Sequence, residues 1–508
     1  MVRFHNTIKQ KNITMKKIFI FLSVFVLFTA CSKLEDLNVN TKDFTVVPGE
    51  SLYNGATRAL VNQMFTPSVN WNHTLLWVQH WAETTYPDES RYDMVTRPVP
   101  AAHQNTMYRI VLANYKDASR LISALTIIPG TTISQEQKDN QLGIIEIMSV
   151  YAWSNLVETY GDMPYSQALD FKNPSPAYDD GLTIYKDLIA RLNAALTKMD
   201  PATAGMSSGY DNIFGGNAAG TVKWIKFGNS LKLRMGIMLA DLDPVYAKTI
   251  IESAASKVFA SGDKAALTYL TASPNQNPVY TELVVSGRSD FVITSNLIDA
   301  MQPTTPAGTI LNVTTTDPRL RFYASTVGGV YKGGKQGSPN SYDAFSHVNP
   351  ALLTSTREVV LMDYAETEFL LAEAVERGFA VGGTAEEHYN NAITASIAYW
   401  GGTTADAASY LAQPAVAYTT AIGTYKQKIG TQAWLAYFQR GFTAWTSFRR
   451  LDFPVLVAPA LHVEGIDKVP VRYTFAVSEQ TLNFSNYSAA AAKIGGDTPL
   501  TKLFWDKF

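Results

Sequence analysis

A single cysteine, Cys31, is the feature that most limits how this chain of 508 residues can fold. A lone cysteine cannot form a disulfide bond within the chain, and it cannot build a cysteine-based zinc site. The folded state must therefore rest on its hydrophobic core. Hydrophobic residues make up 46% of the sequence, which is enough for several domains or for one large helical array.

The position of Cys31 predicts the compartment. Lys16 and Lys17 precede a short apolar run, and small residues stand directly before the cysteine. Basic residues, a short apolar stretch and small residues at a cleavage site are typical of a secretory signal. The run is too short to span a membrane, which takes about 20 apolar residues. We expect a signal peptide over residues 1–30, with Met15 as an alternative start.

The segment Thr29-Ala30-Cys31 resembles a bacterial lipobox, with Phe28 where leucine is usual. We expect Cys31 to be acylated as the first residue of the mature protein, so that its acyl chains hold the protein on a bilayer. Residues 31–50 are then a lipidated, polar tether. The lysine and acidic residues of Ser32-Lys33-Leu34-Glu35-Asp36 resemble the surface-export signal of Bacteroidetes lipoproteins, which Leu34 interrupts. This predicts an outer-membrane protein that faces the extracellular side.

Charge and motifs argue against several classes of protein. The formal net charge is −2, so the chain has no basic excess for nucleic acid. The sequence has no H-E-x-x-H motif and no P-loop. A glycosidase needs two carboxylates several ångströms apart, whereas adjacent pairs such as Asp88-Glu89 and Asp179-Asp180 are more typical of solvated or capping loops. We expect no enzyme activity, no cofactor and no metal site, with a glycoside hydrolase as the remote alternative. There is no EF-hand pattern, which leaves calcium binding open.

From about residue 51 apolar residues recur at helical spacing. A clear example is the set Leu182, Tyr185, Leu188, Ile189 and Leu192. The pattern predicts a helical scaffold over 51–266 and 361–461. Residues 267–360 are rich in Gly, Pro, Ser, Thr and Asn and contain β-like runs such as Leu283-Val284-Val285, which predicts an irregular lobe with short strands. The last segment, 462–508, is again mostly irregular.

One part of the predicted scaffold resembles a repeat unit. Two helical patterns within residues 361–397 are separated by Gly378 and the pair Gly382-Gly383, with Ala372 and Ala392 among the small residues on their inner faces. A helix pair of this length resembles a tetratricopeptide unit, whose period is about 34 residues. A plain helical hairpin is the alternative.

Several segments, in the right order, resemble the SusD/RagB family. They are YGDMPYSQA at 160–168, WIKFGNSLKLR at 224–234, LLAEA at 370–374, Arg449-Arg450 with Pro454, and Pro470-Val471-Arg472-Tyr473 with Glu479 and Asn483. The resemblance covers most of the mature chain. It is strongest to the subgroup described as SusD-like, starch-binding and associated with the outer membrane.

The resemblance implies a mainly α fold. Four tetratricopeptide-like helix pairs would form a right-handed superhelical scaffold on which the irregular lobe packs, so that 51–508 is a single SusD-like domain. It also implies a partner, a SusC-like TonB-dependent transporter that this protein caps as a hinged lid, and a role without catalysis. The motif residues themselves, among them Gly161, Asp162, Asn229 and Arg234, are expected to be architectural rather than ligand contacts.

A glycan presents apolar CH faces and a rim of hydroxyl groups, so it is bound by aromatic rings together with polar side chains. Two regions contain this mixture. The first has Trp71, Trp77, Trp81 and Tyr86, and the second has Tyr280, Arg288, Asp290, Tyr331 and Tyr342. Because Trp77 and Trp81 are four residues apart, they would share one helical face, either as a ligand platform or as a core stripe.

The predicted function is capture of an oligo- or polysaccharide at the cell surface and its delivery to a SusC-like transporter. The alternative is a RagB-type lipoprotein that takes up peptides, because aromatic and scattered polar residues serve either ligand. Predicted partners are thus the transporter, a glycan or peptide, and outer-membrane lipid through acylated Cys31.

Overall fold

The computed structural model describes residues 47–130, 132–305 and 310–507. The expected signal peptide, Cys31 and most of the expected tether lie outside these residues. The α-helices are α3 (Gly49–Phe65), α4 (Thr74–Trp77), α5 (Val99–Asn105), α6 (Ala113–Ser123), α7 (Gln135–Tyr160), α8 (Gly181–Lys198), α9 (Ala218–Met238), α10 (Pro244–Ala254), α11 (Pro278–Tyr280), α12 (Ser295–Met301), α13 (Leu320–Tyr323), α14 (Tyr364–Glu376), α15 (Ala385–Trp400), α16 (Thr404–Leu411), α17 (Tyr425–Ala436), α18 (Gly441–Leu451), α19 (Val477–Leu482) and α20 (Phe484–Lys493).

Shorter elements complete the chain. The strands are β1 (Trp81–Glu83), β2 (Met163–Pro164), β3 (Tyr178–Asp179), β4 (Lys264–Leu267), β5 (Phe291–Ile293) and β6 (Val359–Asp363). The 3-10 and π-helical segments are η2 (Glu89–Arg91), η3 (Thr106–Leu112), η4 (Ala255–Lys257), η5 (Thr281–Val285), η6 (Tyr342–Ala344) and η7 (Pro350–Leu352).

Side-chain caps mark where many of the helices begin. The side chains of Ser134, Asp180 and Asn217 each accept a hydrogen bond from a backbone N–H in the first turn of α7, α8 and α9. Such a cap satisfies one of the free N–H groups at a helix start. At the end of α7, Gly161 has a φ of +87°, a conformation that glycine adopts without a steric penalty.

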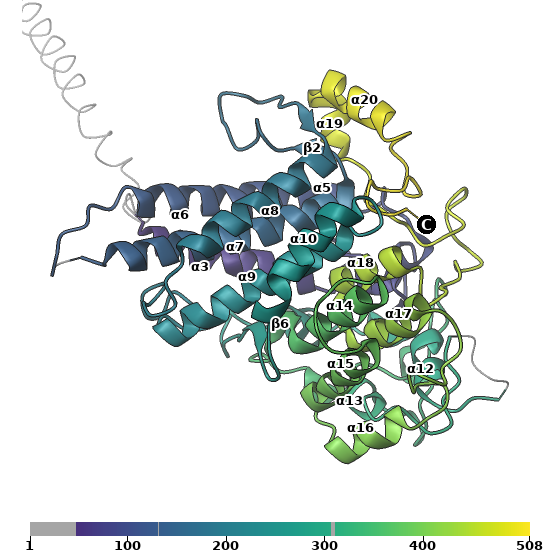
Figure 1. Ribbon diagram of the computed structural model, residues 1–508. Helices are drawn as coiled ribbons and strands as arrows, with labels where there is room; N and C mark the ends of the chain where they lie inside the picture. The colour runs from purple at the N-terminus through teal and green to yellow at the C-terminus, as the bar shows by residue number, and fades with distance from the viewer. Residues whose placement is uncertain (1–46, 131, 306–309, 508) are drawn as a thin grey trace, which may run out of the picture. The chain divides into compact units, whose positions relative to one another are not determined.

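The scaffold consists of helices packed in pairs. α7 packs on α8, α9 on α10, α14 on α15 and α17 on α18, and α9 and α17 both pack on α14 (Figure 1). Helices that follow one another along the chain and pack together form helical hairpins. The prediction of a mainly α, tetratricopeptide-like fold is therefore confirmed.

Three antiparallel strand pairs join distant parts of the chain. β1 pairs with β5, so that Trp81 lies opposite Ile293 and Glu83 opposite Phe291. β4 pairs with β6, and β2 with β3. The β1–β5 pair connects the first region of predicted ligand residues to the second, which are about 200 residues apart in sequence.

The family-like motifs meet inside the scaffold. Glu373 of the LLAEA segment pairs with Arg450 and, at 2.9 Å, with Arg377. Glu366 pairs with Arg440 and lies 3.6 Å from Arg234 of the WIKFGNSLKLR segment. The partner side chains are at most 11% exposed; they are Arg450, Arg377, Glu366, Arg440 and Arg234. Buried charges need such partners, so these motifs serve the architecture of the core.

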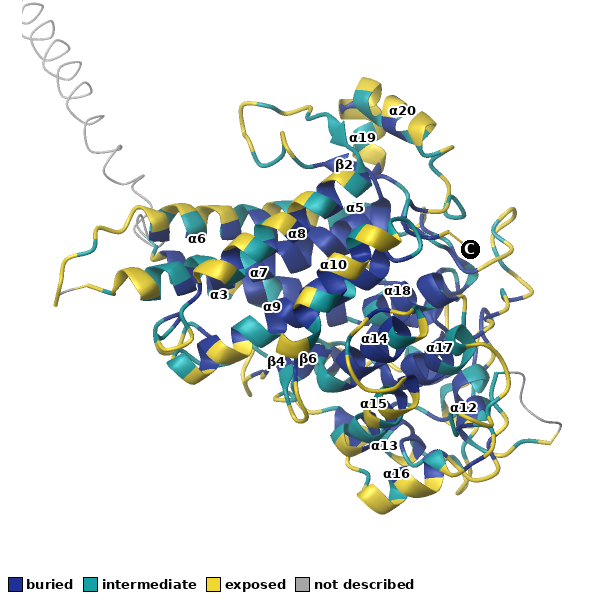
Figure 2. Cartoon of the chain, viewed as in Figure 1, coloured by how far each residue is buried: buried dark blue, intermediate teal, exposed yellow. Residues whose placement is uncertain are grey.

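Burial follows the helix pairs. Figure 2 shows the scaffold helices dark blue where they face one another and yellow on their outer faces, as in α16 and α20.

Two local predictions were wrong. Leu283-Val284-Val285 is not a β-like run but part of the π-helical segment η5. Leu361 belongs to strand β6 and not to the helix that follows: its neighbours Val360 and Met362 pair with β4, and Leu361 lies at the irregularity between them.

Candidate functional site

A surface pocket beside Trp71 is the strongest candidate for a binding site. It has a volume of about 390 Å³. Its lining residues are Ala59, Asn62, Gln63, Thr66, Ser68, Trp71, Thr106, Pro274, Gln276, Pro278, Thr281 and Glu282, and we call it the Trp71 pocket. One wall is the last turns of α3, and the opposite wall is the segment around α11 and η5 from the irregular lobe.

The turn after α3 sets the position of Trp71. The backbone N–H of Trp71 donates to the carbonyl of Ser68 at 2.9 Å, and the side-chain amide of Gln63 donates to the carbonyl of Trp71 at 2.8 Å. Gln63 is itself buried and hydrogen-bonded to His103 at 3.1 Å. The backbone of Trp71 is thus tied to the scaffold, while the residue as a whole is 46% exposed beside the pocket. A backbone held this way loses little conformational entropy when a ligand binds beside it.

The pocket also presents hydrogen-bonding groups. The hydroxyl of Tyr269 donates to the side-chain oxygen of Asn62 at 2.6 Å. The amide nitrogen of Asn62 has no partner among the described residues, so both of its N–H groups are available to a ligand. Sugar hydroxyls and peptide carbonyls both accept such bonds.

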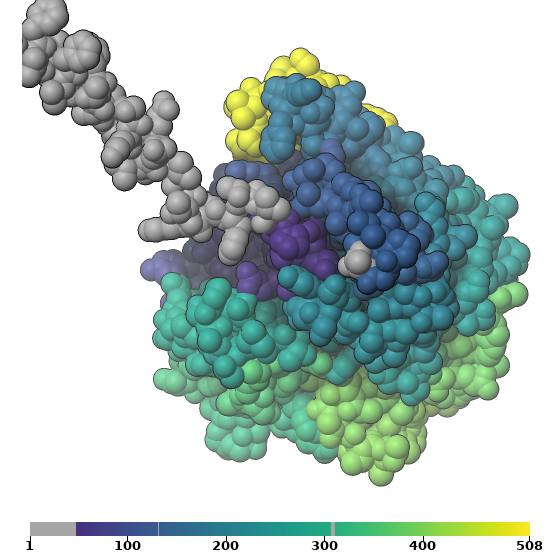
Figure 3. All heavy atoms as spheres, turned by 90° about the vertical axis from the view of Figure 1, so that its left-hand side faces the viewer, coloured from purple at the N-terminus to yellow at the C-terminus, as the bar shows by residue number. Residues whose placement is uncertain are grey.

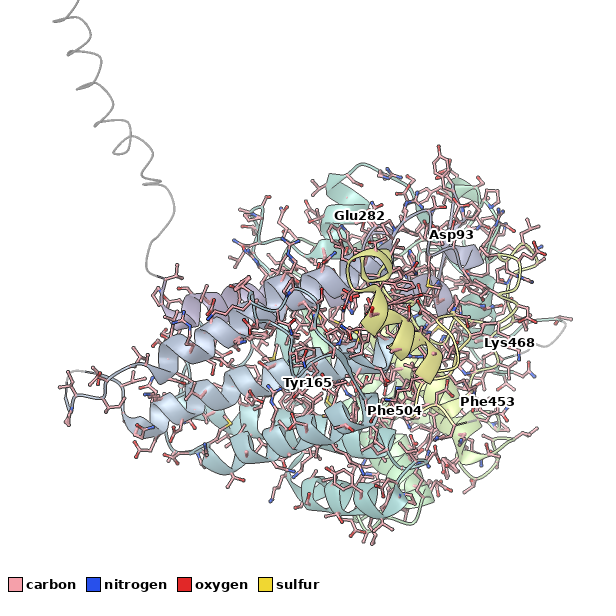
Figure 4. The ribbon with its side chains drawn as sticks, turned by 90° about the horizontal axis from the view of Figure 1, so that it is seen from above. Asp93, Tyr165, Glu282, Phe453, Lys468 and Phe504 are labelled. Carbon is pink, nitrogen blue, oxygen red and sulfur yellow. The ribbon has the colours of Figure 1, made fainter. Side chains whose placement is uncertain are left out.

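Glu282 is the carboxylate of the pocket. It is half-buried on η5, and Figure 4 labels it at the edge of the molecule. Burial raises the pKa of Glu282, while a hydrogen bond from Ser68 lowers it in part. The charges of Asp290 and Arg288 also act on this group. Glu282 therefore links the Trp71 pocket to the residues at its rim.

The rim brings together three of the predicted residues. Arg288 and Asp290 form an ion pair at 2.5 Å, and this bond raises the pKa of Arg288, with smaller contributions from Glu282 and Tyr86. The backbone N–H of Thr84 donates to the carbonyl of Asp290 at 2.9 Å, which continues the β1–β5 pairing. Tyr86, two residues further on, is 69% exposed. Strand pairing thus places Tyr86 near Arg288, although the two are far apart in sequence.

The prediction that Trp77 and Trp81 are ligand residues was wrong, because both side chains are fully buried. They do not share a helical face either: Trp77 ends the short helix α4, and Trp81 begins strand β1. The Trp77 ring lies 5.2 Å from the rings of both Trp445 and Tyr473. The core interpretation holds for both tryptophans.

The other predicted lobe residues lie outside this pocket's lining. Tyr280 is half-buried on α11 between two lining residues, but its side chain does not line the pocket. Tyr342 stacks on His347, with ring centroids 3.8 Å apart and planes at 9°. Tyr331 is half-buried, and burial raises its pKa. The structure therefore does not join Tyr331 and Tyr342 to the Trp71 pocket.

Several lining residues were missed at first sight of the sequence. Ala59, Asn62 and Gln63 lie on one face of α3, with Asn62 and Gln63 three and four residues after Ala59, and Thr66 follows directly after the helix end. Small and polar residues at helical spacing are the signal that could have indicated this face. Glu282 had no such signal, because it directly precedes Leu283-Val284-Val285, which the sequence predicts to be β-like.

One serine motif has the residue spacing of a hydrolase nucleophile. Residues 205–209 read Gly-Met-Ser-Ser-Gly, the spacing of a hydrolase nucleophile elbow, which requires a strand before the serine and a helix directly after it. Ser207 lies instead in the irregular loop between α8 and α9, and its backbone N–H donates to the carboxylate of Glu50. No histidine among the described residues is hydrogen-bonded to its hydroxyl. Ser207 thus lacks the setting of a nucleophile.

Metal binding and membrane crossing also bear on function. Within 47–130, 132–305 and 310–507 there is no group of three or more His, Cys, Asp or Glu side chains that could hold a metal ion. In the same part of the chain, none of the helices combines the length and the apolar character needed to cross a membrane.

Comparison with known proteins identifies relatives of this fold. A family model described as SusD-like, starch-binding and associating with the outer membrane matches residues 41–476. A solved chitin-binding SusD homologue from Flavobacterium johnsoniae is similar, with 22% identity, a TM-score of 0.73, and coverage of 90% of this chain and 99% of the other. A SusD homologue from Parabacteroides distasonis is 20% identical, with a TM-score of 0.74 and coverage of 90% and 97%.

A solved structure described as a chitin-binding protein is also similar, at 23% identity and a TM-score of 0.75, with coverage of 91% of this chain and all of the other. No curated protein sequence matches this chain. At identities this low, the structural similarity establishes the shared fold alone. The family match extends over most of the sequence.

Proposed function

Because the chain belongs to the SusD-like family of starch-binding proteins associated with the outer membrane, we propose that it captures a glycan in the Trp71 pocket. The observation that carries this proposal is the half-exposed Trp71 indole, which is anchored through its backbone beside a cavity lined by polar groups. Two similar structures are described as chitin-binding, which is in keeping with a glycan ligand here.

The pocket suits capture by complementary surfaces. The indole of Trp71 offers an apolar face for the CH groups of a sugar ring. Asn62 offers N–H donors and Glu282 offers acceptor oxygens to the hydroxyl groups around that ring. A polar site of this kind can discriminate between ligands, because a ligand without matching groups would leave buried polar atoms unpaired.

The pocket is better suited to binding than to cleavage. Members of the SusD-like family are binding proteins, and Glu282 is the one carboxylate in the pocket lining. Asp290 nearby is engaged in an ion pair with Arg288. Glycoside hydrolysis uses an acid and a second free carboxylate on either side of the bond.

Capture serves uptake in this proposal. The acyl chains at Cys31 hold the protein on the extracellular face of the outer membrane, and it passes the glycan to a SusC-like TonB-dependent transporter. The support is the family match and the lipobox-like segment at Thr29-Ala30-Cys31. Fractionation of cells that express the full chain tests the anchor: recovery of the protein in the soluble fraction would contradict acylation at Cys31.

The test of capture is binding of the mature protein, from residue 32 onward, to a panel of polysaccharides by affinity gels and calorimetry. We expect Trp71→Ala to weaken binding at least about tenfold, since aromatic anchors in the centre of an interface carry much of the affinity. Phe171→Ala is the matched control, because Phe171 is a fully exposed aromatic residue on a loop away from the pocket. Equal binding by both variants would refute the site, and binding to peptides alone would favour the RagB-type alternative.

A further inference from the structure

A second cavity lies on the same face of α3. It has a volume of about 450 Å³ and is bounded by Ser51, Asn54 and Arg58 of α3, by Asn212 from the loop before α9, and by Asn275 from the lobe. Figure 3 shows the purple surface of α3 between blue and teal surfaces that come from later parts of the chain. None of the residues predicted from sequence as ligand contacts lines this cavity.

The two cavities are neighbours. Arg58 and Asn275 line the second cavity, whereas the adjacent residues Ala59, Pro274 and Gln276 line the Trp71 pocket. The guanidinium of Arg58 donates to the side-chain oxygen of Asn275, and this contact forms the boundary between them. From Ser51 to Phe65 the helix rises about 21 Å, so together the cavities form a binding face much longer than one sugar ring.

The second cavity differs from the first in charge. Arg58 is the one charged residue in its lining, and it is half-buried. Among the described residues its hydrogen-bond partner is the neutral amide of Asn275, and no carboxylate lies within 4.0 Å of it. The nearby Asp211 faces inward, where it accepts hydrogen bonds from the Trp224 indole and from two backbone N–H groups. Within residues 47–130, 132–305 and 310–507, no carboxylate therefore neutralises the positive charge of Arg58.

The chemistry of this cavity suits an anionic substituent. A guanidinium has five N–H donors in a planar fork, and it binds carboxylate and sulfate-like groups through paired hydrogen bonds. Asn212 donates to the side-chain oxygen of Asn54 at 2.7 Å, which leaves the amide nitrogen of Asn54 as a further donor. Donors thus dominate this cavity, in contrast to the Trp71 pocket, which contains Glu282.

We infer that the cavity at Arg58 is a second subsite for an extended acidic polysaccharide, whose carboxylate or sulfate group binds Arg58 while another sugar of the same chain stacks on Trp71. This inference rests on the proposed capture of a glycan and specifies its class. The neutral contact at Trp71 and the ionic contact at Arg58 act on different parts of one ligand, so their effects on affinity can be separated.

The test compares three probes on the mature protein: neutral galactan, polygalacturonate and a sulfated galactan. We expect at least one acidic probe to bind tighter than neutral galactan, and Arg58→Gln to weaken acidic binding about tenfold while it leaves neutral binding unchanged. Binding of the acidic probe is also expected to weaken from 50 to 500 mM NaCl, because a half-exposed ion pair is screened by salt. The preferred acidic probe then tells whether the group is a carboxylate or a sulfate.

Arg321→Gln is the matched control, since it removes the same charge from an exposed arginine of the lobe that lines neither cavity. If neutral galactan binds through Trp71 but acidic probes bind no better, or if Arg58→Gln changes both classes equally, the second subsite is refuted and glycan capture stands. If Trp71→Ala and Arg58→Gln both leave binding of every probe unaffected, both proposals fail. If no acidic probe binds, the second subsite is refuted, and the polysaccharide panel decides whether glycan capture stands.

Discussion

The aromatic cluster around Trp77 and the pocket at Trp71 are built from the same kinds of residue but have opposite surroundings. Trp77 is enclosed by Trp445, Tyr473 and His73. Trp71, six residues earlier, is 46% exposed. The difference lies in what the rest of the chain brings to each residue: helix α18 and the segment after it cover Trp77, whereas Trp71 borders an open pocket between α3 and the segment around α11 and η5. The type of residue is therefore a poor guide to ligand binding without its neighbours.

Acid should affect the core around Trp77 first and most strongly, through its buried histidines. Burial lowers the pKa of His73 and His80 to about 3 and that of His103 to about 4, so these rings are neutral in the fold but take up protons near pH 6.5 when the chain unfolds. Their contribution to stability is complete above pH 6.5 and decreases as the pH falls toward 4. Each group costs about 1.4 kcal/mol per pH unit, or roughly 6 kcal/mol for three groups at pH 5.

Denaturant unfolding at pH 7 and pH 5 measures this loss. His103→Gln should remove about a third of the difference, while His462→Gln, on a loop outside the cluster, should leave it unchanged. An unfolding free energy that is the same at both pH values would mean that the histidines are not held neutral in the core. The aromatic cluster and the Trp71 pocket would then not differ in the way that burial acts on their charged groups.

A pair of alanine substitutions compares the two tryptophans directly. Trp77→Ala should destabilise the protein by about 3–5 kcal/mol, because it leaves a cavity in a packed core. Trp71→Ala should change the unfolding free energy by no more than about 1 kcal/mol, since much of that side chain is already in water. Urea or guanidinium unfolding of both variants gives the two values. Equal losses would show that the Trp71 indole is a structural residue and would weaken its assignment to a binding site.

These contrasts explain how far the sequence could predict the molecule. The helical scaffold was predictable, because its apolar period is local and its helix starts carry caps such as Asp180 and Asn217. The burial of Trp77 was not, because it depends on Trp445 and Tyr473, nearly 400 residues away in sequence. A contact of that range leaves no trace in local spacing.

The candidate site was predictable only in part, because it too depends on contacts between distant parts of the chain. Trp71, Tyr86, Arg288 and Asp290 were identified by residue type, but their proximity depends on the pairing of β1 with β5. Glu282 was missed because its apolar neighbours suggested a strand where the chain forms a π-helical turn. In an irregular lobe, neither residue type nor period indicates which side chains share a surface.

Strand β1 joins the aromatic cluster around Trp77 to the rim of the Trp71 pocket. Its residue Glu83 provides the test with the smallest expected effect. Burial, reinforced by a hydrogen bond with Glu89, raises the pKa of Glu83. The folded state thus retains a proton that the unfolded chain releases near pH 4.5. The contribution of this group is complete below that pH and is lost as the pH rises, which is opposite in sign to the effect of the histidines.

Glu83→Gln keeps a donor in place of the acid proton and removes the titration. The difference in unfolding free energy between the variant and the native chain should then shift in favour of the variant by up to about 1.4 kcal/mol between pH 7 and pH 8. Glu464→Gln, at an exposed position, is the control and should run parallel to the native chain. Parallel profiles for Glu83→Gln as well would show that the Glu83 carboxyl is ionised, and hence that water reaches the strand between the core cluster and the pocket rim.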